Sequence, residues 1–247
     1  MLKHKLFILL FFLIFNNCKS EVIERLNITI SYLSLPTATA EIDLEKRDST
    51  QIISANASSK GIVNAIYKID NKYISICDLS FLPITYEKEI FQKNFQGNKI
   101  VEFKSDKSVA KIINLINENE ISYPIPCHTY DIFSLLFEIR DLLPVEDSSF
   151  YCLANYNIWN VQIKLSGKEF LAFKNKKKEC LKYVMKFEKI FDNNINSRTD
   201  ILTGNLFKKK SRLIFWFSDD EYHIPLKAQY VMFPFSVYWH LISYWHK

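Results

Sequence analysis

The stretch "HTYDIFSLLFEIRDLLP", residues 128–144, has the pattern of one amphipathic helix in a chain that otherwise alternates like β-strands. Thr129 or Asp131 can cap its amino end, and Pro144 stops it. The large apolar side chains fall at helical spacing and form one stripe, namely Ile132, Leu135, Leu136, Ile139 and Leu143. The sequence therefore predicts a single helix over about residues 130–143.

This helix is too short to be stable alone. An isolated helix of about 13 residues is marginal in water. Burial of each large apolar side chain contributes about 1.5–3 kcal/mol, so docking decides whether the helix forms. We expect the stripe to pack against a sheet, either as a fixed wall or as a movable lid over an internal cavity.

The segments on both sides of the helix alternate apolar and polar residues with the period of half-buried strands. Pro36 breaks the first alternation and predicts a hairpin, and further turns are expected at Asp70-Asn71 and at 96–98. Short strands with polar turns favour a mainly β fold, a curved antiparallel sheet or half-barrel with the helix packed against it. Only four glycines occur in 247 residues, so we expect curvature from twist or from bulges at other residues.

The first residues have the pattern of an export signal. Lys3 and Lys5 precede ten apolar residues, Leu6 to Phe15, too few for a transmembrane helix but enough for a signal core. "LIFNNCKS" is similar to a lipoprotein signal, which predicts a signal peptide over 1–17 and lipid attachment at Cys18. Ordinary cleavage after Ser20 and a retained membrane tether are the alternatives. A single mainly β domain is predicted over 18–247.

Charge argues against nucleic acid as a partner. Without Lys3 and Lys5, 30 Lys and Arg face 27 Asp and Glu, a net charge of +3, whereas nucleic-acid binders concentrate a basic face. The basic runs at 174–178 and 208–212 lie between apolar alternations, where solvated turns are expected. Contact with anionic lipid head groups is the alternative for these runs.

The cysteines leave disulfide pairing open. An oxidising compartment would allow up to two disulfides, with three connectivities, among Cys77, Cys127, Cys152 and Cys180. No CxxC spacing is present, and Cys127-His128 with Asp131 makes only a weak set of metal ligands. We therefore predict no metal and no cofactor.

Four segments occur in an order and spacing that resemble one bacterial family: "ISYLSLPTATAEI", "YKIDNKYIS", "YDIFSLLFEIR" and "IFWFSDDEYHIPLKAQ". The family is domain-of-unknown-function family 3108, of exported and largely β proteins, and the resemblance covers most of residues 27–240. The helix from Asp131 to Arg140 and the hairpin from Trp216 to Lys227 are its specific parts. Ser34 and Ala38 stand where the family usually has glycines, which leaves the tightness of the first turn open. The resemblance implies architecture and export but no activity.

The polar residues in these segments fit structural roles. We expect Asp131 as a helix cap, Ser134 as a small packing residue and Arg140 as a strut to a strand carboxylate. Asp219, Asp220 and Glu221 beside His223 could do acid–base or metal chemistry. Because Asp is the natural residue of a tight turn, we expect this trio to shape a hairpin.

Three functions remain after these exclusions. The first is binding or carriage of an apolar or amphiphilic ligand, with ligand-facing candidates Ile132, Leu135, Leu136, Ile139, Phe215 and Phe217. Inner-face aromatics are expected at Phe91, Phe95, Tyr183, Phe187, Phe215, Phe217 and Trp239. The second is a structural or assembly protein of the envelope that acts through a protein partner. An enzyme is the third, and no catalytic signature supports it. The expected location is the cell envelope or periplasm, lipid-anchored at the outer membrane.

Overall fold

The computed structural model describes residues 21–193, 195, 200–208 and 211–247, which form one large sheet and few helices. The helices are α2 (Gly61–Ile66), α3 (Ile132–Leu142) and the 3-10 helix η1 (Ser105–Lys107). The strands are β1 (Glu21–Tyr32), β2 (Leu35–Lys46), β3 (Gln51–Ser59), β4 (Ile69–Cys77), β5 (Pro83–Gln92), β6 (Phe95–Lys104), β7 (Val109–Asn114), β8 (Asn119–Pro124), β9 (Thr129–Tyr130), β10 (Ser148–Ala154), β11 (Asn157–Phe173), β12 (Lys176–Phe191), β13 (Arg212–Ser218), β14 (Pro225–Val231) and β15 (Val237–His246).

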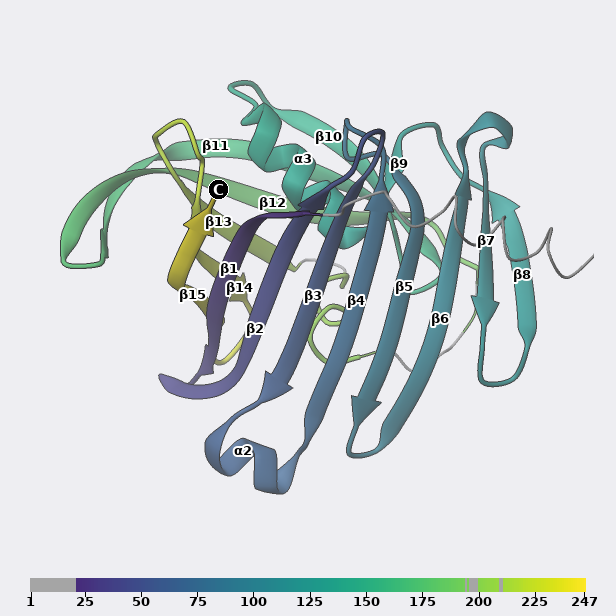
Figure 1. Ribbon diagram of the computed structural model, residues 1–247, viewed down its shortest axis with the longest axis horizontal. Coiled ribbons are helices and arrows are strands. Elements are labelled where there is room, and N and C mark those ends of the chain that lie inside the picture. Colours follow the sequence, from purple (N-terminus) through teal and green to yellow (C-terminus); the bar gives the residue numbers. More distant parts are fainter. Residues whose placement is uncertain (1–20, 194, 196–199, 209–210) are drawn as a thin grey trace, which may run out of the picture.

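The fifteen strands follow the order β8-β7-β6-β5-β4-β3-β2-β1-β15-β14-β13-β12-β11-β10-β9. Neighbours are antiparallel except β9 and β10, which run parallel. Among the described strands, β8 and β9 are the two edges, so the sheet is not closed. Its two halves nevertheless face each other, and α3 lies between them (Figure 1). The prediction of a mainly β, curved sheet with one packed helix is confirmed.

The amino end of α3 explains why the helix starts where it does. The Asp131 Oδ1 accepts hydrogen bonds from the backbone N–H groups of Phe133 at 2.8 Å and Ser134 at 3.1 Å, and the Ser134 Oγ accepts one from the Asp131 N–H. This reciprocal capping box satisfies N–H groups that have no partner within the helix. Asp131 is therefore the cap, and the helix ends at Leu142, two residues before Pro144.

Two faces of α3 are buried rather than one. Ile132, Leu135, Ile139 and Leu143 join the main core, while Leu136 of the predicted stripe is only half-buried. On another side, Phe137 packs against Phe81 with ring centroids 5.6 Å apart. The helix is thus packed on two sides, between the halves of the sheet.

An ion pair fastens the last turn of α3 to the sheet. The Arg140 guanidinium donates two hydrogen bonds of 2.6 Å to the carboxylate of Glu24 on β1. The Glu24 side chain is only 2% exposed. The predicted strut is thus present, in the bidentate geometry that makes Arg–carboxylate pairs strong.

The hairpins turn tightly with almost no glycine. Leu33 and Ser34 both have positive φ and connect β1 to β2 in two residues, and Lys174 and Asn175 do the same between β11 and β12. Positive φ at both central residues is the geometry that matches strand twist. The first turn is therefore tight although Ser34 is not glycine, and the basic run at 174–178 begins in a hairpin turn and continues into β12. Register shifts interrupt several strand pairs, such as the one between Asn27 and Ile28.

Two turn predictions were wrong. The break near Asp70-Asn71 lies earlier, at α2, because Asn71 is buried within β4 and its amide donates to the Tyr73 hydroxyl at 2.8 Å. The turn expected at 96–98 lies at residues 93–94. Gly97 instead sits inside β6, where an added Cβ would come within 3.0 Å of the Phe95 ring. The helix α2 was also not predicted from the sequence.

Candidate functional site

Of the six side chains predicted to face a ligand, four belong to α3 and two, Phe215 and Phe217, belong to β13. Leu135 and Ile139 are at most 1% exposed, and Phe215 and Phe217 stack on each other with centroids 5.6 Å apart. Leu136 is half-buried against the same core. Of these six described residues, only Ile132 borders a cavity. Side chains, not open space, thus surround the helix.

The predicted inner-face aromatics divide in a similar way. Tyr183 and Phe187 are buried, and Phe95 and Trp239 are half-buried and line cavities. Phe91 was placed wrongly: it is 43% exposed, beneath the Lys68 ammonium. Its neighbour Ile90 points inward instead, and successive side chains of a strand point to opposite faces.

An apolar hollow of about 380 Å³ lies at the end of the molecule that carries α2. Its lining residues are Ile30, Tyr32, Thr37, Ala38, Val63, Tyr67, Ile69, Ile201, Leu202, Asn205, Leu206, Tyr230, Met232, Val237 and Trp239. Among the described residues that line it, none is Asp, Glu, His, Lys, Arg or Cys. A volume of about 300–1,000 Å³ with mostly apolar walls is typical of a small-ligand site.

The helix α2 forms one wall of the hollow without filling it. Its six residues include none that is fully buried, and only the half-buried Val63 and the following Tyr67 line the hollow. The Lys60 N–H donates to the Thr37 carbonyl at 2.9 Å, which ties the start of α2 to β2. Because α2 is short and presents few side chains to the cavity, it borders the cavity without occupying it.

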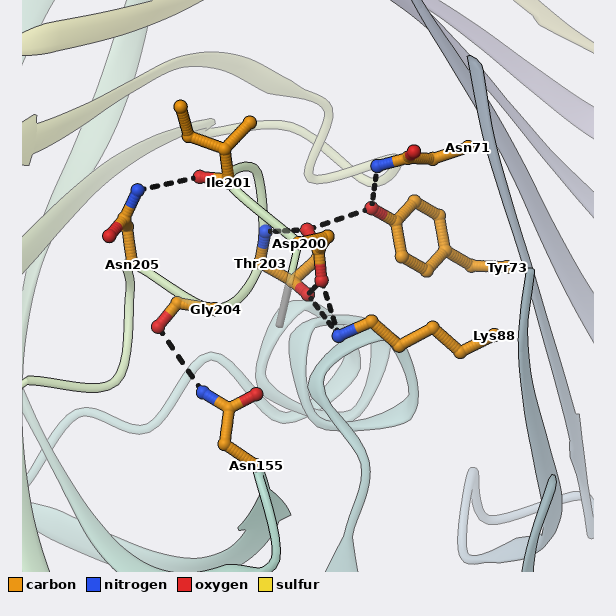
Figure 2. Close-up of polar contacts among 9 residues, drawn as sticks. All are labelled: Asn71, Tyr73, Lys88, Asn155, Asp200, Ile201, Thr203, Gly204 and Asn205. Carbon is orange, nitrogen blue, oxygen red and sulfur yellow. Dashed lines mark hydrogen bonds and ion pairs between the residues drawn. The ribbon is translucent and has the colours of Figure 1, made fainter. Parts of the chain in front are cut away.

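The opposite wall, residues 200–206, is tied to the sheet by a buried polar network (Figure 2). The Asp200 carboxylate accepts hydrogen bonds from the Thr203 N–H at 2.6 Å and from the Tyr73 hydroxyl at 3.0 Å. It also forms an ion pair with Lys88 of β5. Asn71 donates to Tyr73 from behind, so the network extends from the wall into β4.

The network keeps Asp200 ionised. Burial alone would raise the pKa of this carboxyl, but the charge and hydrogen bond of Lys88 and the two donors of Thr203 outweigh it and lower the pKa. The Tyr73 hydroxyl beside it has a strongly raised pKa, mainly because of burial and then because of the Asp200 charge. The wall is therefore fixed by a charge that the surrounding groups stabilise.

A second cavity, of about 60 Å³, lies on the other side of this wall. Thr203 and Phe207 face it, whereas Leu202 and Leu206 face the hollow. It contains the Lys99 ammonium, 4.4 Å above the Tyr156 ring, and burial lowers the pKa of this lysine. This space is small for an organic ligand, so the hollow is the better candidate.

The acidic trio shapes a turn between β13 and β14. The Ser218 hydroxyl donates to the Asp220 carboxylate at 2.7 Å, and the Tyr222 N–H donates to the same oxygen at 3.2 Å. Lys178 pairs with Asp220, and Lys168 pairs with Asp219. Burial alone would raise the pKa of Asp220, but the hydrogen bonds and charge supplied by Lys178, Ser218 and the Tyr222 N–H outweigh it, and the pKa is lowered. Each of the two Asp carboxylates is thus engaged by the neighbouring β11–β12 hairpin.

Among the described residues, the cysteines and the Cys127-His128 pair form neither a disulfide nor a cluster of metal ligands. Cys77, Cys152 and Cys180 are buried, Cys127 is exposed, and none of these four described residues forms a disulfide. The Asp131 carboxylate is used by its helix and by Ser75, which donates to it at 2.6 Å. Within the described ranges, no three of His, Cys, Asp and Glu gather as metal ligands would.

The predicted leader 1–17 and the lipid-attachment residue Cys18 lie outside the described residues, as do residues 209–210 of the second basic run. No helix in the described part of the chain is long and apolar enough to cross a membrane.

Sequence patterns missed the hollow because two of its walls, α2 and residues 200–206, come from segments that connect the strands forming the rest of its lining. The available signal was apolar residues where loops are usually polar, at Ile62, Val63 and Ile66 and again at Leu202 and Leu206. These residues have no strand or helix period of useful length, so a search for periodicity passes over them.

A solved structure shares this architecture. A beta-barrel-like protein of domain of unknown function DUF1849 from Brucella abortus superposes with a TM-score of 0.61 at 6% identity, over 92% of this chain and 98% of that one. Another protein, titled a "putative lipoprotein" from Parabacteroides distasonis, gives a TM-score of 0.36 at 10% identity, over 93% and 100%. The first likeness concerns the fold alone.

No curated protein matches the sequence. The family model described as "Protein of unknown function (DUF3108)" matches residues 27–234, as the four segments and the α3 and β13–β14 motifs predicted. The chain therefore belongs to the DUF3108 family.

Proposed function

We propose that this protein is a non-enzymatic binding protein of the cell envelope that holds the apolar part of an amphiphilic ligand, such as an acyl chain, in the hollow. The observation that carries the proposal is the hollow itself, about 380 Å³ with almost entirely apolar walls. The polar side-chain groups among its described lining residues are those of Thr37 and Asn205, the tyrosine hydroxyls and the indole N–H of Trp239. A ligand with polar groups along its length would have to bury those groups in the hollow without hydrogen-bond partners, which is unfavourable.

The lining also favours binding over catalysis. General acid–base chemistry needs a titratable group within hydrogen-bond reach of the reacting atoms. Apart from tyrosines, none lines the described part of the hollow. The nearest charged pair, Asp200 and Lys88, is engaged in holding the wall.

The proposed location is the periplasmic side of the envelope, with Cys18 acylated and attached to the outer membrane. The apolar run Leu6–Phe15 followed by "NNCKS" supports this. Cells grown with labelled fatty acid should mark the wild-type protein and leave Cys18→Ala unmarked. An unmarked wild-type protein released in soluble form would mean ordinary secretion instead.

The binding proposal is tested by filling the hollow. Val63→Trp adds a large side chain at a half-buried position of α2 that packs little, so the fold should tolerate it. Val145→Trp is the matched control, at a position that is 82% exposed beyond α3. A fluorescent fatty acid should bind the wild-type protein and the control but not Val63→Trp. Equal binding by all three, or no binding by any, would remove the proposal.

An assembly function is the second candidate because large apolar side chains are exposed around the mouth of the hollow, with Phe233 95% exposed. A protein partner could cover them. In that case Val63→Trp would leave partner binding unchanged, and the protein would take up no fatty acid.

A further inference from the structure

The mouth of the hollow is surrounded by exposed apolar side chains, which we name the apolar rim. Its members are Leu33 and Leu35 of the β1–β2 hairpin, Ile62 and Ile66 of α2, Ile201, and Met232, Phe233 and Phe235 of the β14–β15 connection. Three of them are exposed by 66% (Leu35), 79% (Ile62) and 95% (Phe233).

These residues belong to one place, because each adjoins the lining of the hollow. Ile62 and Ile66 flank Val63 on α2, and Phe233 follows Met232, which lines the hollow itself. Across the rim, the rings of Phe235 and Tyr32 touch edge to face at 6.3 Å. An exposed apolar concentration of this kind marks an interaction site rather than ordinary surface.

Basic side chains accompany the rim. Lys60 and Lys68 are exposed at the two ends of α2, and Asp70 is the exposed acidic residue that follows them. A pair of lysines beside protruding apolar side chains complements the anionic head groups and apolar interior of a bilayer surface.

We propose that the apolar rim inserts into the surface of an anionic lipid bilayer, so that an acyl chain passes between the bilayer and the hollow without crossing water. The proposal rests on the proposed function. Each CH₂ group that stays out of water is worth about 0.8 kcal/mol, so a mouth sealed against the bilayer removes a large barrier. The rim residues stand on four separate segments, the β1–β2 hairpin, α2, the segment 200–206 and the β14–β15 connection, which can enter a fluid surface side by side.

This contact does not depend on the predicted anchor. β1 begins at Glu21, three positions after Cys18, and runs for 12 residues to Tyr32 at the rim. At about 3.3 Å per residue, the two ends of β1 are roughly 40 Å apart. The rim therefore lies at the far end of β1 from Glu21, the described residue nearest to Cys18 in the sequence, and its lipid contact can be measured at the rim itself.

The experiment places a reporter on the rim. Phe233→Trp and the control Val145→Trp are compared, each relative to wild-type, on vesicles of phosphatidylcholine with phosphatidylglycerol and with brominated acyl chains. Only Phe233→Trp should show a blue shift and quenching by the brominated chains. In that background, Lys60→Ala and Lys68→Ala should each weaken vesicle binding about fivefold, whereas Lys107→Ala, in η1 at the other end, should not.

Each other outcome overturns the proposal. Quenching absent from Phe233→Trp, or equal in Val145→Trp, means that the rim does not meet lipid. A blue shift without vesicles that grows with protein concentration means that a second copy covers the rim. If Phe233→Trp is unquenched but fatty acid still binds in a way that Val63→Trp blocks, the membrane inference fails and the binding function stands.

Discussion

The two described α-helices, α2 and α3, lie beside parts of the interior that are packed differently. α3 has 11 residues, a capping box and five buried side chains, and the space around it is filled. α2 has six residues, no side-chain cap in the described structure and no buried side chain, and the space beside it is open. α3 is long enough to carry an apolar stripe, which packs into the core. α2 is too short for such a stripe, and a cavity remains beside it. Binding is therefore expected at the end where packing is incomplete.

Each interior is also fastened by a buried ion pair. Arg140 joins α3 to Glu24 on β1, and Lys88 of β5 holds Asp200 in the wall of the hollow. Stability and binding can thus be altered separately, and the following variants test that separation.

The largest effect is expected at the α3 end. Arg140→Ala leaves the Glu24 carboxylate buried without its partner, which should lower the free energy of unfolding by about 3–5 kcal/mol. Urea denaturation measures it, and the double variant Glu24→Gln/Arg140→Met should recover much of the loss. An Arg140→Ala protein as stable as wild-type would show that the pair does not hold the helix.

The next effect compares neighbouring positions on α3. Leu135→Ala should cost about 2–5 kcal/mol because it leaves a cavity in a filled core. Leu136→Ala should cost less, since Leu136 is only half-buried. Neither change should alter fatty-acid binding if α3 is a fixed plug. Altered uptake by Leu136→Ala, with little loss of stability, would mean that α3 is a lid.

Acid should weaken the wall of the hollow through Asp200. The folded state lowers the pKa of Asp200, so its stabilisation is present above the ordinary pKa of about 3.9 and is lost as pH falls through the lower folded pKa. The difference in unfolding free energy between wild-type and Asp200→Asn should stay constant from about pH 5 to 7 and shrink below about pH 4. A difference independent of pH would contradict this role.

The smallest effect is expected at the acidic turn, which belongs to neither interior. Asp220→Asn should change stability by about 1 kcal/mol or less, as surface substitutions usually do. Added divalent metal should leave the Tm unchanged in both proteins. A metal-dependent rise in Tm that Asp220→Asn abolishes would revive a metal site there.

Several features that depend on interactions between residues close in sequence were predicted correctly. The stripe of α3, its Asp131 cap and the alternation of the strands are visible within short windows, and so is the acidic turn. The Glu24 partner of Arg140 was predicted only as some strand carboxylate, because 116 positions separate the two residues. Phe91 was placed on the wrong face because an apolar residue can occupy either face of a strand.

The hollow could not be predicted in this way. The hollow exists because the side chains of α2 and of residues 200–206 do not fill the space at this end of the sheet. No single segment of the sequence has a pattern that indicates such an unfilled space. The expectation that a ligand would lie against the α3 stripe followed from treating the most regular apolar surface as the site. In the structure, most side chains of this stripe are part of the packed core.

The central claim is that the ligand lies at the α2 end, against Trp239, and not beside α3. A spin-labelled fatty acid tests this directly, since Trp239 lines the hollow, whereas Trp216 is buried and is not among its described lining residues. Binding should quench the wild-type fluorescence, and Trp239→Phe should lose most of that quenching while Trp216→Phe keeps it. Quenching that survives Trp239→Phe and disappears with Trp216→Phe would contradict the account.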